Sequence, residues 1–316
     1  MITRAERAWK GLFRPTERIM SKRGLGLALG EGGARGLAHI GVLQVLQDSG
    51  IRVDHVAGTS MGAVVGAMYA ETLDPYLIQK RFEDLMEEDD FAQLGLKRFS
   101  RGEKREASFW DMIGAKIKGT VALNLAQTRL GLLKSERLER PLESLIHIRD
   151  FSDCRIPFVA LTTDICWGRE IPICTGNLVR AVTASAAIPG FFTPVEHEGF
   201  YLSDGAICCP LPVPYAEYAE DAVTMGVAVP TSLNRKMEPE NAIDIMLRAE
   251  EVNMHYFTSR LMERANIALY PDIGNVQWHE MQRLREMVQA GREAAEAALP
   301  QLERELRKGR GWLSFR

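Results

Sequence analysis

Ser60 lies between two glycines in the segment AGTSMGA (57–63), at the spacing G-x-S-x-G. The run IRVDHVAG (51–58) before it predicts a strand, and MGAVVGAMYAETL (61–73) after it predicts a helix. A serine on a sharp strand-to-helix turn projects its hydroxyl into a cleft, and Gly58 and Gly62 provide the room for that turn. The chemistry indicated is nucleophilic attack by Ser60, and the alternative is that Ser60 only caps the helix.

A second candidate feature is the glycine-rich loop GEGGARG (30–36), which follows a short apolar run over 24–30. Glycines between a strand and a helix leave backbone N–H groups unobstructed at the helix N-terminus, where negative charge is stabilised. Three ligands compete: a dinucleotide pyrophosphate, a nucleotide phosphate and an oxyanion developing on an ester carbonyl. The P-loop spacing is absent, which excludes the second. The dinucleotide fingerprint fits only loosely, because Arg35 occupies its third glycine position.

A base for the serine is the next requirement. Asp204 ends a predicted strand and is followed by Gly205, so its carboxylate is a candidate general base if burial raises its pKa from about 4 toward neutrality. The alternative is an ordinary Asp-Gly turn. The six histidines give little support to a serine–histidine pair, since we expect packing or surface roles for all of them: His39, His55, His147, His197, His255 and His279.

The elements that position these residues alternate between strand and helix, which predicts a parallel sheet with helices on its faces. Further strands are expected at 156–165, 170–175, 200–206 and 222–230, giving a sheet of about six. The predicted fold is a three-layer α/β/α arrangement with a mostly parallel central sheet. The glycine loop and the Ser60 turn both follow the carboxyl ends of strands, so we expect them to face one another.

The four motifs GLALGEGGARGLAHIGVL (26–43), GTSMG (58–62), ASAAIPGFFTPV (184–195) and DGA (204–206), in this order, resemble the patatin-like phospholipase family, specifically its short bacterial members. The resemblance runs from about residue 24 to 230. It implies a Ser-Asp dyad without histidine, in which Ser60 is the nucleophile and Asp204 the general base. It also implies an oxyanion hole formed by backbone N–H groups of Gly32, Gly33, Ala34 and Arg35.

On this resemblance the chain is expected to be a serine acyl hydrolase of phospholipids, lysophospholipids or related acyl esters, with no metal or organic cofactor. Phe191 and Phe192 are candidates for contact with an acyl chain, and a core position is the equal alternative for both rings. Two positions depart from the family pattern. Glu31 stands where a glycine is frequent and adds a carboxylate near the oxyanion hole, and Cys209 stands where an asparagine is common.

Charge is unevenly distributed along the 316 residues, although the net charge is only -3. Residues 1–23 hold seven Lys or Arg against two Glu, and residues 97–134 hold nine against three acidic residues. Both stretches mix bases with large apolar side chains, a composition typical of a segment lying on an anionic membrane surface. The alternative is that both are helices packed on the domain with solvated bases outside. Nucleic acid is not an expected partner, because the total charge is negative and no nucleic-acid motif is present.

Compartment and organisation complete the predictions. Five cysteines without a C-x-x-C pair, no apolar run of spanning length and no apolar leader predict a cytoplasmic protein, peripheral at the inner face of the membrane. We expect three parts: a basic amphipathic segment (1–23), a catalytic domain (24–230) with a helical insertion at about 74–150, and a helical extension (231–316) packed on that domain. No oligomeric state is predicted. The other function classes considered are a nucleotide-binding oxidoreductase, a histidine-dependent α/β-hydrolase and a non-catalytic membrane-associated regulatory protein.

Overall fold

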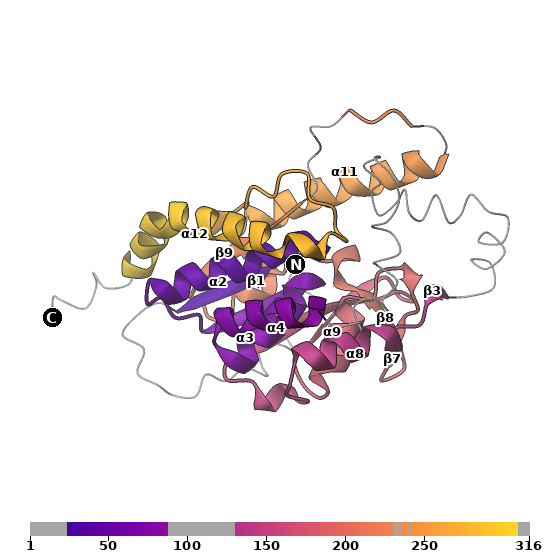
Figure 1. The fold of residues 1–316 in the computed structure, drawn as a ribbon, viewed down its shortest axis with the longest axis horizontal. Coiled ribbons are helices and arrows are strands. Elements are labelled where there is room, and N and C mark those ends of the chain that lie inside the picture. The colour runs from indigo at the N-terminus through magenta and orange to yellow at the C-terminus, as the bar shows by residue number, and fades with distance from the viewer. Residues whose placement is uncertain (1–23, 88–129, 231–232, 234–235, 240–241, 309–316) are drawn as a thin grey trace.

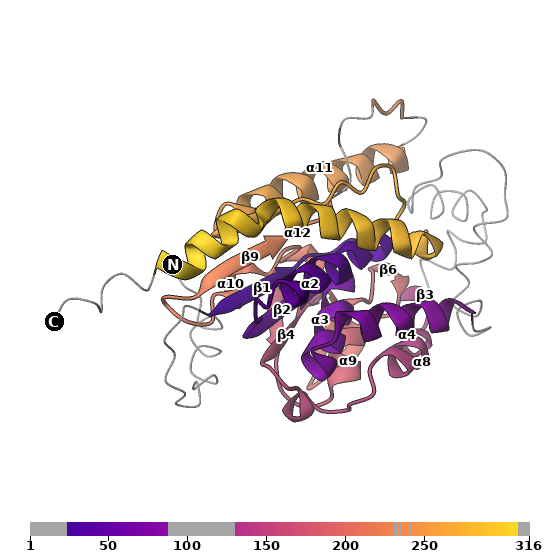
Figure 2. The ribbon, with the colours of Figure 1, turned by 60° about the vertical axis from the view of Figure 1, so that its left-hand side comes forward.

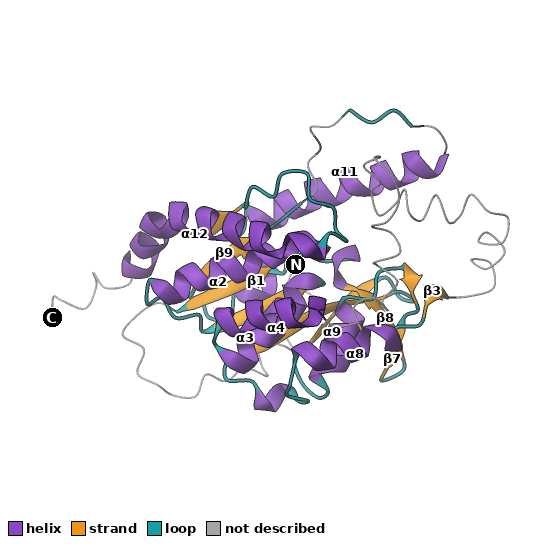
Figure 3. Cartoon of the chain, in the orientation of Figure 1, coloured by secondary structure: helices purple, strands orange, loops and turns teal. Residues whose placement is uncertain are grey.

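The computed structural model describes residues 24–87, 130–230, 233, 236–239 and 242–308. A central eight-stranded sheet carries helices on both faces (Figures 1 and 3). Its order is β10-β9-β1-β2-β4-β8-β7, and β5 pairs with β4 in addition. The strands are β1 (Leu25–Leu29), β2 (His55–Thr59), β4 (Phe158–Asp164), β5 (Arg169–Ile173), β7 (Val195–His197), β8 (Phe200–Asp204), β9 (Val223–Val227) and β10 (Ile267–Leu269).

Strand direction divides the sheet into two parts. The pairs β10–β9, β9–β1, β1–β2 and β2–β4 are parallel. Beyond β4 the pairings with β5 and β8, and that of β8 with β7, are antiparallel. The predicted α/β fold with a mostly parallel sheet is therefore confirmed.

Alternate residues of the central strands face two separate cores. On β1, Leu25, Leu27 and Leu29 contribute to one core, and Ala28 contributes to the other. The first core lies under α2 (Ala38–Asp48), α3 (Met61–Thr72), α4 (Pro75–Glu87), α8 (Glu136–Leu145), α9 (Leu178–Ser185) and α12 (Leu284–Arg307). The second core lies under α10 (Val213–Ala216) and the end of α11 (Ala242–Met262). Strands that are buried on both faces are largely apolar along their length, which is why they could be predicted from the sequence.

The short elements are those the sequence pattern does not predict. A two-stranded parallel sheet joins β3 (Gly131–Leu133) to β6 (Gly190–Phe192), and β3 lies within the insertion at about 74–150 that is expected to be helical. The tail, expected to be helical throughout, contributes β10 to the edge of the central sheet. The expected six strands are thus too few, because three-residue strands carry no measurable periodicity. Four 3-10 helices complete the described elements: η1 (Gly33–Leu37), η3 (Phe151–Asp153), η4 (Gly205–Ile207) and η5 (Met281–Arg283).

The long C-terminal helix α12 lies alongside α2 (Figure 2). The two helices approach closely at Gly41 and Gly291, where an added Cβ would lie 1.9 Å from the carbonyl oxygens of Val288 and Ala38 respectively. None of the helices in the described part of the chain is long and apolar enough to cross a membrane. The predicted basic segment 1–23 and most of the basic stretch 97–134 lie outside the described residues.

Candidate functional site

Ser60 occupies the turn between β2 and α3, with φ 56° and ψ −121°. This is a conformation that residues other than glycine rarely adopt, and it is the strain expected of a serine on a sharp strand-to-helix turn. The flanking glycines are sterically required. A Cβ at Gly62 would lie 2.2 Å from the Leu29 carbonyl oxygen, and one at Gly58 would lie 2.3 Å from the Gly62 carbonyl oxygen. The turn therefore forms only because α3 can approach the end of β1 this closely.

Asp204 ends β8 and is buried beside the serine. Ser60 Oγ donates a hydrogen bond of 2.8 Å to Asp204 Oδ2 across a sequence separation of 144 residues. Strand β4 brings the two together, because it pairs with β2 through Leu161 opposite Thr59 and with β8 through Thr162 opposite Asp204. The second carboxylate oxygen, Oδ1, accepts 2.9 Å from the Ala206 amide.

The pKa of Asp204 is raised from 3.8 to about 7, chiefly by burial and to a smaller extent by the negative charge of Glu31. The hydrogen bonds from the Ala206 amide and the Ser60 hydroxyl oppose that rise, since they stabilise the carboxylate. A carboxylate with a pKa near neutrality can accept a proton and return it at physiological pH.

The glycine loop is fixed to the sheet before it turns into η1. Gly30 N donates to the Val227 carbonyl at 3.0 Å, and Glu31 N donates to the Pro210 carbonyl at 2.9 Å. Within the described residues neither Gly32 N nor Gly33 N donates a hydrogen bond. These two N–H groups are consequently the ones in the loop that remain available to an added anion.

The structure differs from the predicted oxyanion hole at the amides of Ala34 and Arg35. Ala34 N donates to the Trp278 carbonyl at 2.6 Å, and Arg35 N donates to the Gly32 carbonyl at 3.2 Å. Both donors are already used inside the protein, so the predicted contribution of these two residues is not supported. The Arg35 side chain instead closes the loop, since its Nε donates to the Gly32 carbonyl at 3.1 Å.

Glu31 lies close to this site. Burial raises the pKa of its carboxyl, and the positive charge of Arg35 partly offsets that rise. The charge of Glu31 acts in turn on Asp204. The departure from the family pattern at position 31 therefore tunes the candidate base.

Ser185 is a contributor that the sequence reasoning missed. Its Oγ, at the end of α9 and fully buried, accepts 3.0 Å from the backbone N–H of Ser60. The hydrogen bond satisfies the amide of a strained residue, which would otherwise be buried without a partner. The motif ASAAIP carries this serine, but nothing in its spacing indicates which atom the hydroxyl contacts.

His39 of α2 and His55 of β2 both have hydrogen-bond partners in the backbone of the protein. His39 Nε2 lies 2.9 Å from the Gly30 carbonyl, and His55 Nε2 lies 2.8 Å from the Tyr215 carbonyl. Burial lowers the pKa of each to about 4, so both are neutral at physiological pH. No histidine in the described ranges hydrogen-bonds to Ser60. His39 supports the glycine loop, which is the packing role expected for it.

Phe191 and Phe192 are core residues in this structure, with 2% and 5% of their surfaces exposed. They pack edge to face at 4.9 Å between ring centroids, and Phe191 also contacts the Trp278 ring at 6.2 Å. Their predicted contact with an acyl chain is not supported, and the alternative of a core position describes both. Trp278 thus joins the tail both to this core and to the glycine loop.

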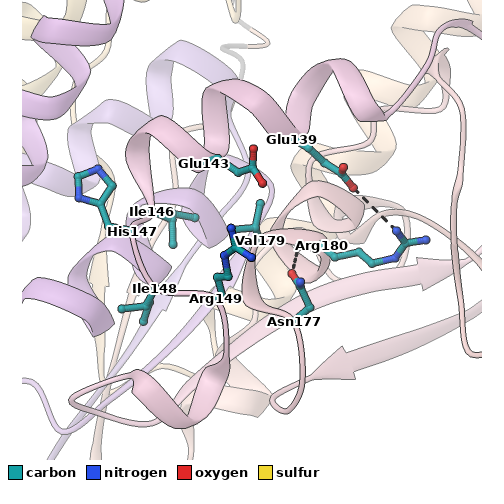
Figure 4. Close-up of a pocket in the computed structure, with 9 residues that line it drawn as sticks. All are labelled: Glu139, Glu143, Ile146, His147, Ile148, Arg149, Asn177, Val179 and Arg180. Carbon is teal, nitrogen blue, oxygen red and sulfur yellow. Dashed lines mark hydrogen bonds and ion pairs between the residues drawn. The ribbon is translucent and has the colours of Figure 1, made fainter.

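A separate cavity of about 470 Å³ lies between α8 and the start of α9 (Figure 4). Glu139 and Arg180 form an ion pair at its rim, and Asn177 caps α9 through the Arg180 amide. Ser60 and Asp204 do not line it. Among the described residues no group of three or more His, Cys, Asp or Glu could hold a metal ion.

Comparison with known proteins defines the class to which this fold and site belong. The model of the patatin-like phospholipase family matches residues 27–217, a range that contains the glycine loop, Ser60 and Asp204. The chain belongs to the patatin-like phospholipase family, as the order of its motifs predicted.

Particular relatives are known from bacteria and fungi. An uncharacterized NTE family protein of Mycobacterium tuberculosis (strain ATCC 25618 / H37Rv) is 32% identical over 187 residues, which cover 59% of this chain and 44% of the relative. Lysophospholipase NTE1 of Yarrowia lipolytica is 31% identical over 201 residues, which cover 64% of this chain and 12% of the relative. The chain thus spans less than half the length of these relatives.

Among solved structures, VipD from Legionella pneumophila aligns with a TM-score of 0.49 at 15% identity. The alignment covers 89% of this chain and 67% of VipD.

Proposed function

We propose that this protein is a serine acyl hydrolase that cleaves carboxylic ester bonds of phospholipids or lysophospholipids. The observation that supports it most is the 2.8 Å hydrogen bond from Ser60 Oγ to Asp204 Oδ2 at the carboxyl edge of the sheet. Family membership and the lysophospholipase name of a relative support a lipid ester as the substrate class.

In the proposed acylation step Ser60 Oγ attacks the ester carbonyl carbon while its proton passes to Asp204 Oδ2. The carbonyl oxygen becomes an oxyanion, which accepts hydrogen bonds from the N–H groups of Gly32 and Gly33. Loss of one such donor typically costs about 3 kcal/mol of transition-state stabilisation. The tetrahedral intermediate then collapses, the bond to the alcohol oxygen breaks, and the leaving alcohol takes the proton from Asp204.

Deacylation repeats these roles with water as the nucleophile. Asp204 accepts a proton from water as the water oxygen attacks the acyl-serine carbonyl. The bond to Ser60 Oγ breaks, Ser60 regains the proton from Asp204, and the fatty acid is released. The raised pKa of Asp204 suits both directions of transfer, because one group has to be base and then acid in each step.

The proposed place of action is the inner face of a membrane, with the protein bound peripherally. The basic, apolar-rich composition of residues 1–23 and 97–134 supports this. Binding through those segments is expected to weaken as salt rises, and equal binding to neutral and anionic vesicles would contradict it.

The experiment that tests the function is turnover of a short-chain nitrophenyl ester and a lysophospholipid by the purified protein, compared with the Ser60→Ala and Asp204→Asn variants. We expect wild type to release nitrophenol and free fatty acid, and both variants to lose at least about a thousandfold in kcat/KM. Circular dichroism of each variant controls for folding.

The other function classes predict different results in the same experiment. Activity retained in Asp204→Asn but lost in one His→Ala variant would favour a histidine-dependent hydrolase. Absence of turnover together with tight NADP binding would favour an oxidoreductase. Absence of turnover with vesicle binding unchanged by Ser60→Ala would favour a regulatory protein.

A further inference from the structure

The hairpin that joins β4 to β5 exposes a group of large apolar side chains at its tip. Trp167 is 78% exposed and Ile165 is 45% exposed, whereas the strand that leads to them is buried throughout. Tyr201 of β8, 42% exposed, lies beside them, because the Ile165 amide donates to the Tyr201 carbonyl at 3.0 Å. We call Ile165, Trp167 and Tyr201 the hairpin patch.

The register of the sheet places this patch just beyond the candidate site. Strand β4 runs parallel to β2, with Leu161 opposite Thr59, so Ser60 is level with Thr162. Thr162 also pairs with Asp204. Ile165 follows Thr162 by three positions, and at about 3.3 Å per residue it lies roughly 10 Å further along the strand direction. The hairpin therefore projects past the edge at which Ser60 and Asp204 lie.

The tip is held rigidly by one buried carboxylate at its base. Asp164, fully buried, accepts 3.2 Å from the Cys166 amide and 3.3 Å from Arg169 Nε. The Asp164 carbonyl accepts 2.9 Å from the Gly168 amide, and Gly168 supplies the φ of 63° that the turn needs. Arg169 also lies 5.1 Å from the centre of the Phe200 ring. Little conformational entropy is left to lose when such a tip is buried in another medium.

We propose that the hairpin patch inserts into the surface of a phospholipid membrane and thereby seats the edge that carries Ser60 and Asp204 on the lipid. This inference rests on the proposed function, since it names how that site reaches a membrane-bound ester. Trp and Tyr are the side chains favoured at membrane–water interfaces, because each combines an apolar ring with a polar atom.

The size of the patch favours lipid over protein as the occupant. A stable protein interface buries about 800 Å² on each partner, and three side chains fall well short of that area. Insertion into lipid needs no matching surface, because its strength scales with the apolar area that is buried, to which attraction between basic residues and anionic lipid adds. Binding through inserted rings is expected to persist at salt concentrations that remove electrostatic attraction.

The test measures insertion directly with vesicles of phosphatidylcholine and phosphatidylglycerol, with and without bromine on the acyl chains. It uses the full chain with Ser60→Ala, so that binding is read without turnover. The fluorescence difference between this protein and its Trp167→Phe derivative isolates Trp167, and we expect brominated lipid to quench that difference. Lack of quenching would overturn the proposal.

Vesicle co-sedimentation at high salt provides the second readout. We expect Trp167→Ser to weaken binding about tenfold, as is typical when one large apolar side chain is lost from a buried position. The matched control is Leu77→Ser, since Leu77 is 36% exposed at the start of α4. This helix follows the end of α3 at the opposite edge of the sheet, where the Arg155 amide ahead of β4 donates to the Ala70 carbonyl. Equal weakening by both variants, or by neither, would overturn the proposal. The proposal would also be overturned if the protein formed a dimer in solution that Trp167→Ser abolished, while brominated lipid caused no quenching.

Failure of this proposal is distinguishable from failure of the proposed function. Trp167→Ser should keep wild-type kcat/KM on a monomeric short-chain ester and lose activity on vesicle substrate alone. If the wild-type protein does not turn over esters, the proposed function is wrong. The quenching result still shows in that case whether the hairpin patch contacts lipid.

Discussion

At the scale of single residues, the proposed reaction depends on whether Asp204 carries a proton. Ser60 Oγ donates to a carboxylate whose pKa burial raises to about 7. As the proposed base, Asp204 has to be ionised in the free enzyme, so the proposed mechanism operates above its pKa and fails below it. The raised pKa therefore places the acid limit of activity close to neutrality.

The first prediction concerns the pH dependence of kcat/KM. We expect it to fall about tenfold per pH unit below roughly pH 6, as protonated Asp204 accumulates. Glu31→Gln removes the negative charge that raises the pKa of Asp204, so its acid limb should shift to lower pH. The measurement is a pH profile with a monomeric ester. A limb near pH 4 in wild type, or a shift to higher pH in Glu31→Gln, would contradict the assignment.

A second prediction addresses Ser185, a positioning residue that acts through the Ser60 amide. Ser185→Ala leaves that buried N–H without its partner, which costs about 1–3 kcal/mol. We expect a lower melting temperature and a lower kcat, with the acid limb unchanged because Asp204 is untouched. Ser185→Thr keeps the hydroxyl and should recover part of both. An unaltered kcat in Ser185→Ala would mean that this hydrogen bond does not hold the nucleophile in place.

At the scale of elements, the position of Ser60, the proposed nucleophile, depends on how closely α3 approaches β1. The carbonyls of Leu29 and Gly30 lie where a side chain at Gly62 would begin. The same element pair positions the glycine loop that follows β1, so strain in one is transmitted to the other.

The third prediction is that Gly62→Ala destabilises the fold by about 2–3 kcal/mol and abolishes activity, because its Cβ would meet backbone atoms at 2.2 Å. Gly66→Ala, in the same helix, is the matched control. Its Cβ would meet side-chain atoms of Phe158 and Val56 at 2.9 and 3.0 Å, a smaller overlap than the 2.2 Å backbone contact at Gly62, and alanine favours the helix. Chemical denaturation of both variants measures the difference, and equal stabilities would show that the close approach at Gly62 is unimportant.

Elements also mark the boundary of what the sequence predicts. Buried strands such as β1, β2 and β4 begin with or contain runs of apolar residues, and β1 and β2 are followed by Gly30 and Ser60. The parallel sheet and the edge that carries the candidate site could therefore be predicted from the sequence. The strands β3, β6, β7 and β10 have three residues each, too few for a period. Strands β7 and β10 pair with longer neighbours at the edges of the central sheet, and β3 and β6 pair with each other, so all four depend on tertiary contacts.

The candidate site also contains residues that could be predicted from the sequence and residues that could not. Ser60 and Asp204 could be found from turn chemistry and motif order. The hydrogen bond from the Ala34 amide to the Trp278 carbonyl could not be predicted. Trp278 lies 244 positions later in the chain, and no local pattern connects its loop to the glycine loop. Ser185 was missed for the same reason, since a hydroxyl in a helix has many possible partners.

At the scale of the whole molecule, the C-terminal tail completes the fold around the site. Its strand β10 pairs with β9, α12 packs on α2, and the Trp278 carbonyl accepts from the Ala34 amide. The division into a catalytic domain (24–230) and a helical extension (231–316) remains a prediction. The contacts across it indicate that the two parts stabilise one another.

The fourth prediction tests that mutual support. Gly291→Leu should push α12 away from α2, where even a Cβ would lie 1.9 Å from the Ala38 carbonyl, and we expect a loss of at least about 2 kcal/mol. Ala297→Leu introduces the same side chain at an exposed position of α12 and should change stability by less than about 0.5 kcal/mol. Thermal unfolding of both should show one transition. Two separate transitions in wild type would mean that the tail and the domain unfold independently.

Covalent labelling tests directly whether Ser60 is a nucleophile that Asp204 activates. Purified wild type is treated with a fluorophosphonate, and the modified residue is located by peptide mass spectrometry, with Ser60→Ala and Asp204→Asn alongside. We expect one adduct on Ser60 in wild type and none at that position in Ser60→Ala. In Asp204→Asn we expect labelling of Ser60 to be slower by orders of magnitude. Labelling of Ser60 at an undiminished rate in Asp204→Asn, or no labelling of well-folded wild type, would contradict the proposed mechanism.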